Sequence, residues 1–134
     1  MLFYGIIYAA MQSANASRVP KVKKQSHKQK KQLTEYFAGE RKIFDLPLVL
    51  NGTAFQILAW KQLMKIPYAQ TISYAEQAEK IGDRKKARVV GMANGLNPIP
   101  IIIPCHRVIG SNGQLTGFAG GMDKKTYLLN FEKA

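Results

Sequence analysis

Apolar side chains recur through the middle of the chain at the spacing of a helix. Between residues 54 and 65, three large apolar positions share one helical face: Ile57, Trp60 and Met64. Thr53 precedes this segment and Gln56 follows three residues later, so the two can form a capping box that starts a helix. Pro67 then prevents its continuation. We expect a helix over about 54–65, with Trp60 in the core rather than at a site.

A second capping box predicts another helix, about two turns long. Ser73 and Glu76 have the required spacing, and Gly82 with Asp83 suits a tight turn followed by a new N-cap. The next helix, over 84–94, has an apolar side and a basic side. We expect the inward positions to be Val89, Val90 and Ala93, and the outward basic ones Arg84, Lys85 and Arg88.

Two helices joined by a glycine-containing turn, the second basic on one side, form a helix-turn-helix outline. Such an outline fits a DNA-binding element, and it fits a structural helical hairpin equally well. The pattern alone leaves both interpretations open.

The other segments carry weaker signals. In chain order we expect a short helix over 31–41 closing at Gly39, an extended segment over 43–50, an extended connection over 97–100, a buried isoleucine run over 101–103, a tight hairpin turn over 111–114 and a closing helix over 122–133. Pro47 favours a loop or an edge within 43–50. Residues 2–10 are apolar, and without a preceding basic residue we expect a buried strand or a domain remnant there rather than a signal peptide.

Composition narrows the class of protein. The chain has 134 residues, 46% of them hydrophobic, which is a globular level and the size of one ordinary domain. A single cysteine excludes an internal disulfide framework and a multi-thiolate metal site within one chain. No apolar stretch is long enough for a membrane-spanning helix. With a free thiol and no targeting signal, we expect the cytoplasm.

Positive charge dominates the chain and is unevenly distributed. Twenty Lys and Arg against eight Asp and Glu leave a net charge of +12, which makes nucleic acid the expected partner. Residues 18–42 hold nine basic and two acidic side chains, a net of +7. This Lys/Gln-rich segment can be a solvated linker or exposed helix start, or it can be an arm that follows DNA.

Cys105 follows the isoleucine run, and such a cysteine is usually a small buried hydrophobic residue. A nucleophile would need a source of thiolate stabilisation, such as neighbouring His106 or Arg107. Adjacent side chains on a strand point to opposite sides, so His106 could reach the sulfur only through a turn or a water. Local chemistry alone does not assign the thiol a role.

The order of motifs in the second half is more specific. Ser73-Tyr74 is followed by Ala87-Arg88-Val89-Val90-Gly91, Ala93-Asn94-Gly95, Asn97-Pro98-Ile99-Pro100-Ile101, Ile103-Pro104-Cys105-His106-Arg107-Val108-Ile109-Gly110 and Thr116-Gly117-Phe118-Ala119-Gly120-Gly121. From Ser73 to Glu132 the chain resembles the O6-alkylguanine-DNA alkyltransferase family along nearly its whole length. Upstream segments around Phe44, Phe55 and Ile66 also resemble the bacterial members.

The resemblance implies a fold and a domain division. The fold is mainly α with small β elements, a winged-helix-like helix-turn-helix domain preceded by a truncated α/β remnant. We expect residues 1–42 to be the remnant and basic linker, and 43–134 to be the DNA-binding and active-site domain. Some relatives bind zinc in the preceding region, but Asp45 stands where a histidine would be needed. We expect no metal and no cofactor.

The resemblance also implies an activity. Family members repair DNA by transferring an alkyl group from O6 of guanine, and also from O4 of thymine, to an internal cysteine that is consumed. Here Cys105 would accept the alkyl group, His106 would relay the thiol proton through a water, and Glu132 would orient the imidazole. Tyr74 would donate a proton toward guanine N3, and Asn97 would hold the turn before the active site. The activity is that of a methylated-DNA–[protein]-cysteine S-methyltransferase.

The family binds the minor groove with the second helix of the helix-turn-helix and rotates the damaged nucleotide out of the stack. Arg88 matches the arginine that fills the resulting gap. The implied DNA-binding set is Arg88, Tyr74, Ala87, Gly91, Ala93 and Asn94, and the implied base pocket is Pro100, Val108, Phe118 and Ala119. The expected partner is double-stranded DNA containing O6-alkylguanine, bound by a monomer, with no membrane involved.

Two alternatives remain. One is a non-catalytic sensor of the alkyltransferase-like type, which binds alkylated DNA without repairing it. Those proteins have tryptophan where this chain has Cys105, so the thiol favours repair. The other is a small basic helix-turn-helix regulator in which Cys105 is merely part of the core.

Overall fold

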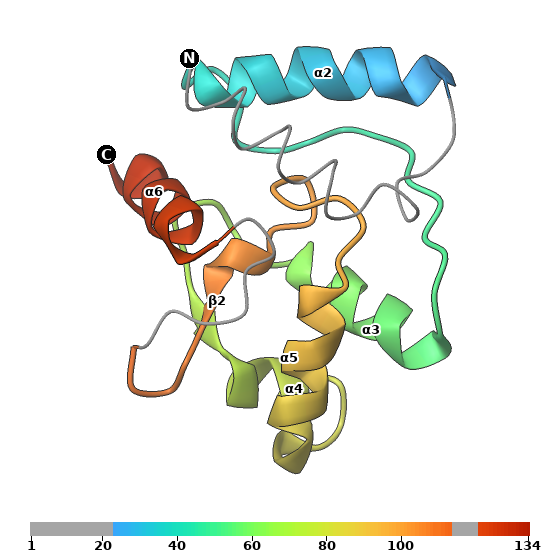
Figure 1. Cartoon of the computed structure of the whole chain (residues 1–134), viewed down its shortest axis with the longest axis vertical. Coiled ribbons are helices and arrows are strands. Elements are labelled where there is room, and N and C mark those ends of the chain that lie inside the picture. Colours follow the sequence, from blue (N-terminus) through green and yellow to red (C-terminus); the bar gives the residue numbers. More distant parts are fainter. Residues whose placement is uncertain (1–22, 114–120) are drawn as a thin grey trace.

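The computed structural model of the chain describes residues 23–113 and 121–134, and it is mostly helical (Figure 1). In chain order its elements are α2 (Lys23–Phe37), α3 (Ala54–Leu63), β1 (Ile72–Ser73), α4 (Tyr74–Lys80), the 3-10 helix η1 (Arg84–Lys86), α5 (Ala87–Gly95), the 3-10 helix η2 (Cys105–Arg107), β2 (Val108–Ile109) and α6 (Met122–Lys133). The expected class, helices with a small β component, is confirmed. Among the described residues, no helix is long and apolar enough to cross a membrane.

Both predicted capping boxes form. The Thr53 side chain accepts a hydrogen bond from the backbone of Gln56 at 3.1 Å, and the Gln56 side chain accepts one from the backbone of Thr53 at 3.0 Å. Ser73 and Glu76 make the same exchange at the start of α4. These bonds satisfy backbone donors that a helix start would otherwise leave unpaired.

The helix-turn-helix outline corresponds to α4, η1 and α5, which pack together at the lower end of the molecule (Figure 1). Gly82 has a φ of +117°, a conformation that favours glycine, and the Asp83 side chain caps η1. Of the three residues expected to face inward, Val90 and Ala93 do so, but the prediction for Val89 is wrong because its side chain is 49% exposed. Met64 is likewise 47% exposed, and Leu63 occupies the buried position.

The sheet consists of two short parallel strands. Ile72 pairs with Val108 and Ser73 pairs with Ile109. This register places the first residue of α4, Tyr74, beside the chain that leaves η2. Segments more than thirty residues apart in the sequence therefore meet at one point.

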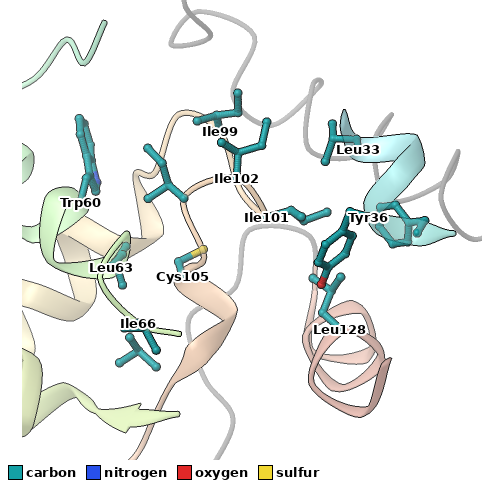
Figure 2. Packing of buried hydrophobic residues seen from close by; sticks show 13 residues of the cluster. Leu33, Tyr36, Trp60, Leu63, Ile66, Ile99, Ile101, Ile102, Cys105 and Leu128 are labelled. Atoms are coloured by element: carbon teal, nitrogen blue, oxygen red, sulfur yellow. The ribbon is translucent and has the colours of Figure 1, made fainter. Parts of the chain in front are cut away.

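Helix α2 lies at the end of the molecule opposite α4 and α5 (Figure 1). The predicted start at residue 31 is wrong, since the helix begins at Lys23 and includes part of the basic segment. It ends at Phe37, and Gly39 follows with a φ of +79°. Leu33, Tyr36 and Phe37 are buried in the same core cluster as Trp60 of α3 (Figure 2). The domain boundary after residue 42 stays a prediction.

Residues 43–50 form no regular strand, yet the predicted alternation holds in their burial. Phe44, Leu46, Leu48 and Leu50 are half-buried against the core, and the residues between them are exposed. Residues 110–113 make a tight turn in which the Gly113 N–H donates to Gly110 O at 2.8 Å. The return strand of the predicted hairpin and the expected strand at residues 2–10 lie outside the described residues.

One glycine is required by close packing rather than by its backbone conformation. A Cβ added to Gly52 would lie 2.7 Å from Oε1 of Gln56 and 2.8 Å from the ring of Trp60. We therefore expect Gly52→Ala to lower the free energy of unfolding by about 1–3 kcal/mol, through displacement of the capping glutamine and the core tryptophan. Urea unfolding followed by tryptophan fluorescence measures this. Gly95→Ala is the control, because a Cβ there meets nothing within 4 Å; equal stability losses in the two variants would contradict the packing argument.

Candidate active site

Asn97 holds the backbone turn that leads to the cysteine. Its Nδ2 donates to Ile103 O at 2.7 Å, and its Oδ1 accepts from Ile99 N at 2.9 Å. Residues 97–100, predicted to be an extended connection, instead enter this tight turn, because the buried amide of Asn97 joins its two ends. Ile101 within it has a φ of +76°, a costly conformation for a β-branched residue that surrounding contacts must maintain. The Asn97 side chain thus bridges the backbone of this turn, and its expected part in catalysis stays a prediction.

Cys105 begins η2 immediately after this turn and is only 5% exposed (Figure 2). Burial raises the pKa of its thiol to about 11, against the opposing effects of the Asn97 amide and the Lys125 ammonium. At neutral pH the resting thiol is therefore protonated. Nucleophilic attack by this sulfur requires a base that removes the proton.

His106 can serve as such a base, because its imidazole is neutral and one of its ring nitrogens is free to accept a proton. It is fully buried, and burial lowers its pKa, so the imidazole is neutral at pH 7. Its Nε2 lies 2.7 Å from Oε2 of Glu132. An ionised carboxylate only accepts hydrogen bonds, so Nε2 carries the ring proton and Nδ1 carries the lone pair. Within the described part of the chain Nδ1 is buried and has no hydrogen-bond partner.

Glu132 receives hydrogen bonds from several donors besides His106. Arg107 donates Nε to Oε1 and Nη2 to Oε2, both at 2.9 Å, and the Tyr36 hydroxyl donates to Oε2 at 2.6 Å. Ala69 N donates to Oε1 at 3.2 Å. Burial alone would raise the pKa of this carboxyl, but the bonds from His106, Arg107 and Tyr36 outweigh it and hold the pKa well below the usual range.

Lys125 is a further charged residue inside the site, beside Glu132 and Arg107, and the sequence analysis missed it. Its side chain is fully buried, and Nζ donates to Val108 O at 2.7 Å and to the Tyr74 hydroxyl at 3.4 Å. Burial lowers the pKa of Lys125 to about 8. The signal that could have found it is its spacing on α6: Lys125, Leu128, Leu129 and Glu132 fall on the buried face at intervals of three and four.

Tyr74 connects this cluster to the helix-turn-helix. It is the first residue of α4, and its ring packs against Gly91 of α5, where an added Cβ would lie 3.6 Å from the ring. On the outer side of α5, Arg88 is exposed, and Ala87 is half-exposed beside it. The site and the exposed side of α5 are therefore neighbours.

Not every predicted site residue lies where it could meet DNA or a base. Ala93 and Asn94 are 4% and 2% exposed, and the Asn94 amide exchanges two hydrogen bonds with Gln77 at 2.8 and 3.0 Å. In this structure both stabilise the contact between helices instead of presenting a binding surface. Pro100 and Val108 are buried, and the Val108 N–H donates to Cys105 O, while Phe118 and Ala119 lie outside the described residues.

Sequence reasoning also missed Tyr36 and the role of Arg107 toward Glu132. Arg107 is held further by Ile66 O, which accepts from Nη1 at 2.7 Å, and by the ring of Tyr68, 5.6 Å from its guanidinium. Across residues 23–113 and 121–134, no three His, Cys, Asp or Glu side chains gather as a metal site would require.

The buried carboxylate leads to a prediction about stability. Glu132→Gln removes the negative charge while leaving Arg107 buried, and losing one partner of a buried ion pair costs about 3–5 kcal/mol. We expect urea unfolding at pH 7 to show a loss of that size. Arg84→Gln is the control, since it removes an exposed pair with Glu79 and should change stability by less than about 1 kcal/mol.

The same carboxylate fixes the direction of the pH dependence. The folded-state pKa of Glu132 lies below its unfolded value of about 4.3. Its contribution is therefore present in full above that value and is lost as the pH falls toward the folded pKa. The stability difference between the wild type and Glu132→Gln should shrink below about pH 4; a difference that stays constant down to pH 2 would contradict the assignment.

Comparison with known proteins agrees with this geometry. Residues 54–134 match the family model described as 6-O-methylguanine DNA methyltransferase, DNA binding domain. A Mycobacterium tuberculosis relative named methylated-DNA–protein-cysteine methyltransferase is 56% identical over 103 residues, which are 77% of this chain and 62% of the relative. A Methanosarcina acetivorans relative of the same name is 55% identical over 102 residues, covering 76% of this chain and 65% of the relative.

Solved structures resemble the chain to a similar extent. The Mycobacterium tuberculosis protein OGT in complex with DNA matches with a TM-score of 0.76 and 55% identity, covering 78% of this chain and 64% of that one. The chain thus spans a little over three fifths of the length of the curated relatives that it matches. Because the family model accounts for more than half of the chain, and because its residues 54–134 include the buried cysteine, histidine and glutamate described above, the chain belongs to the 6-O-methylguanine DNA methyltransferase family.

Proposed function

We propose that this chain repairs DNA by moving an alkyl group from O6 of guanine, and also from O4 of thymine, to Cys105, which is consumed in the reaction. One observation carries the proposal: next to the only thiol in the sequence, η2 holds a buried neutral histidine that is oriented by an ionised glutamate and has a ring nitrogen unpaired among the described residues. A purely structural cysteine needs no such neighbour. The names of the similar proteins support the same activity.

The transfer balances without a cofactor. His106 Nδ1 takes the proton of the Cys105 thiol through a bridging water, and the imidazolium so formed is stabilised by Glu132. The sulfur attacks the alkyl carbon, so that an S–C bond forms while the bond from that carbon to O6 breaks. The electron pair of the broken bond stays on guanine, which must gain a proton to leave as a neutral base. Cysteine then remains as a thioether.

Tyr74 and Lys125 suit the protonation of the leaving guanine. The Lys125 Nζ is 3.4 Å from the Tyr74 hydroxyl oxygen and 5.7 Å from the centroid of the Tyr74 ring. With a pKa of about 8, most of the Lys125 population carries a proton at neutral pH. A cation beside a phenol favours loss of the phenolic proton, so Tyr74 can donate toward guanine N3 while Lys125 stabilises the charge that remains.

DNA would approach the exposed side of α5. Arg88 is exposed there, and the 3-10 helix before it carries Arg84, Lys85 and Lys86, all exposed. We propose that α5 enters the minor groove and that Arg88 fills the gap left by the rotated nucleotide. The proposed partner is double-stranded DNA that contains O6-alkylguanine, bound by a single copy of the chain within a winged-helix-like domain over residues 43–134.

The sensor alternative is not favoured. A protein that only recognises alkylated DNA has no use for a proton acceptor beside a thiol, and this chain retains Cys105, His106 and Glu132 together. The regulator alternative is not favoured for the same reason. Neither alternative gives the His106–Glu132 pair a chemical role.

Mass spectrometry tests the transfer. The chain is incubated with a duplex that carries O6-methylguanine, and intact and peptide masses are then recorded. We expect the peptide that contains Cys105 to gain one methyl group in place of its thiol hydrogen, at most one per molecule. Cys105→Ser should gain none. Lesion-selective binding without a mass gain would support the sensor, and equal binding to damaged and undamaged duplex without a gain would support the regulator.

Arg88→Ala tests the extrusion step separately from the chemistry. We expect the rate of methyl transfer from duplex DNA to fall at least tenfold, because rotating a nucleotide out of the stack costs a few kcal/mol that Arg88 helps to offset. Reaction with the free base O6-benzylguanine should be unchanged. Arg41→Ala is the matched control, because it also removes an arginine but one that pairs with Glu35 of α2, at the opposite end of the molecule from α5. Equal losses with duplex and with free base would contradict the proposed role of Arg88.

A further inference from the structure

Tyr36 reaches the active site from the far end of the sequence. It lies on α2, 96 residues before Glu132, and its side chain is fully buried. Its hydroxyl donates to Glu132 Oε2 at 2.6 Å, the shortest of the hydrogen bonds that this carboxylate receives. Figure 2 shows the hydroxyl directed away from α2 and toward α6.

The ring of Tyr36 is fixed by aromatic neighbours independently of its hydroxyl. Its centroid lies 5.0 Å from that of Phe37, 5.6 Å from Phe44 and 5.5 Å from Phe131. Phenylalanine would fill the same space, and a buried hydroxyl stabilises a protein only when it is hydrogen-bonded. The oxygen therefore needs an explanation of its own, and its one hydrogen bond leads to the carboxylate that orients His106.

The Tyr36 hydroxyl and His106 share one carboxylate oxygen. Oε2 faces His106 Nε2 at 2.7 Å, Arg107 Nη2 at 2.9 Å and Tyr36 Oη at 2.6 Å. Each donor takes part of the negative charge on that oxygen, so each reduces what the others experience. Tyr36 is the only one of the three that can be reduced to a hydrocarbon without removing a formal charge or the base itself.

We propose that Tyr36 is a positioning residue for the alkyl transfer. Its hydroxyl keeps Oε2 of Glu132 in place and weakens the electrostatic stabilisation that this oxygen gives to protonated His106. The inference rests on the proposed function, because it assigns Tyr36 to the base of that reaction. It also makes α2, at the opposite end of the molecule from α5, a part of the catalytic unit.

The sign of the effect follows from the charges around His106. Glu132 favours the imidazolium, whereas burial, Arg107 and Lys125 disfavour it. Tyr68 adds a neutral phenol near Glu132. Removing the Tyr36 hydroxyl leaves more charge on Oε2 facing His106, which raises the pKa of the imidazole. A base with a raised pKa is protonated, and therefore unable to accept the thiol proton, up to a higher pH.

Tyr36→Phe tests this in the full chain. The single-turnover rate of methyl transfer is measured against pH with a duplex containing O6-methylguanine. We expect the acidic limb of the profile to move up by about one pH unit, so that the rate is about tenfold lower on that limb and similar to wild type above it. Damage to packing would instead lower the rate equally at every pH. Tyr68→Phe is the matched control, a neighbouring hydroxyl that makes no hydrogen bond with Glu132.

A second readout does not depend on activity. An NMR pH titration of the ¹⁵N-labelled imidazole of His106 follows this base directly. We expect Tyr36→Phe to raise the pKa of His106. A pH–rate profile that superimposes on wild type, or a uniform loss with an unchanged His106 pKa, overturns the inference. A wild-type chain that transfers no methyl group overturns the proposed function itself.

Discussion

The buried carboxylate of Glu132 is the interaction on which the rest of the site depends. Five hydrogen bonds reach it from α2, from the loop before β1 and from η2. A carboxylate in this position would be costly without them, and with them it stays ionised. Because the donors come from separate segments, the same group that orients His106 also joins the start of the described chain to its end.

Burial and the charges inside the site keep the resting thiol protonated and therefore weakly nucleophilic. Burial raises the pKa of Cys105 and lowers those of His106 and Lys125, which keeps the thiol protonated and the imidazole neutral. In the proposed transfer, reactivity depends on removal of the thiol proton at the moment of attack rather than on a thiolate already present. Cys105 would react once in that transfer, and such a resting state would protect the sulfur from other electrophiles.

Local sequence signals were sufficient where the physics is local. The capping boxes at Thr53 and Ser73 form as predicted, because their hydrogen bonds join residues three apart. Helical spacing was less informative about which side is buried: Met64 and Val89 are apolar yet exposed. A periodic pattern gives the faces of a helix, but the neighbours that cover one face come from elsewhere in the chain.

By itself the sequence determined the capped starts of α3 and α4, the turn at Gly82, and, through its resemblance to a family, the candidate roles of Cys105, His106 and Glu132. The predicted helix over 84–94 instead divides into η1 and α5, and α2 begins before the predicted residue 31. Only the tertiary structure decided that Tyr36 and Lys125 belong to the same site. Their contacts span 96 and 17 residues along the chain. Spacing on α6 places Lys125 on the same face as Glu132, but it does not give the partners of either side chain. Those partners depend on how α2, β2 and α6 pack, and packing is settled by the whole core.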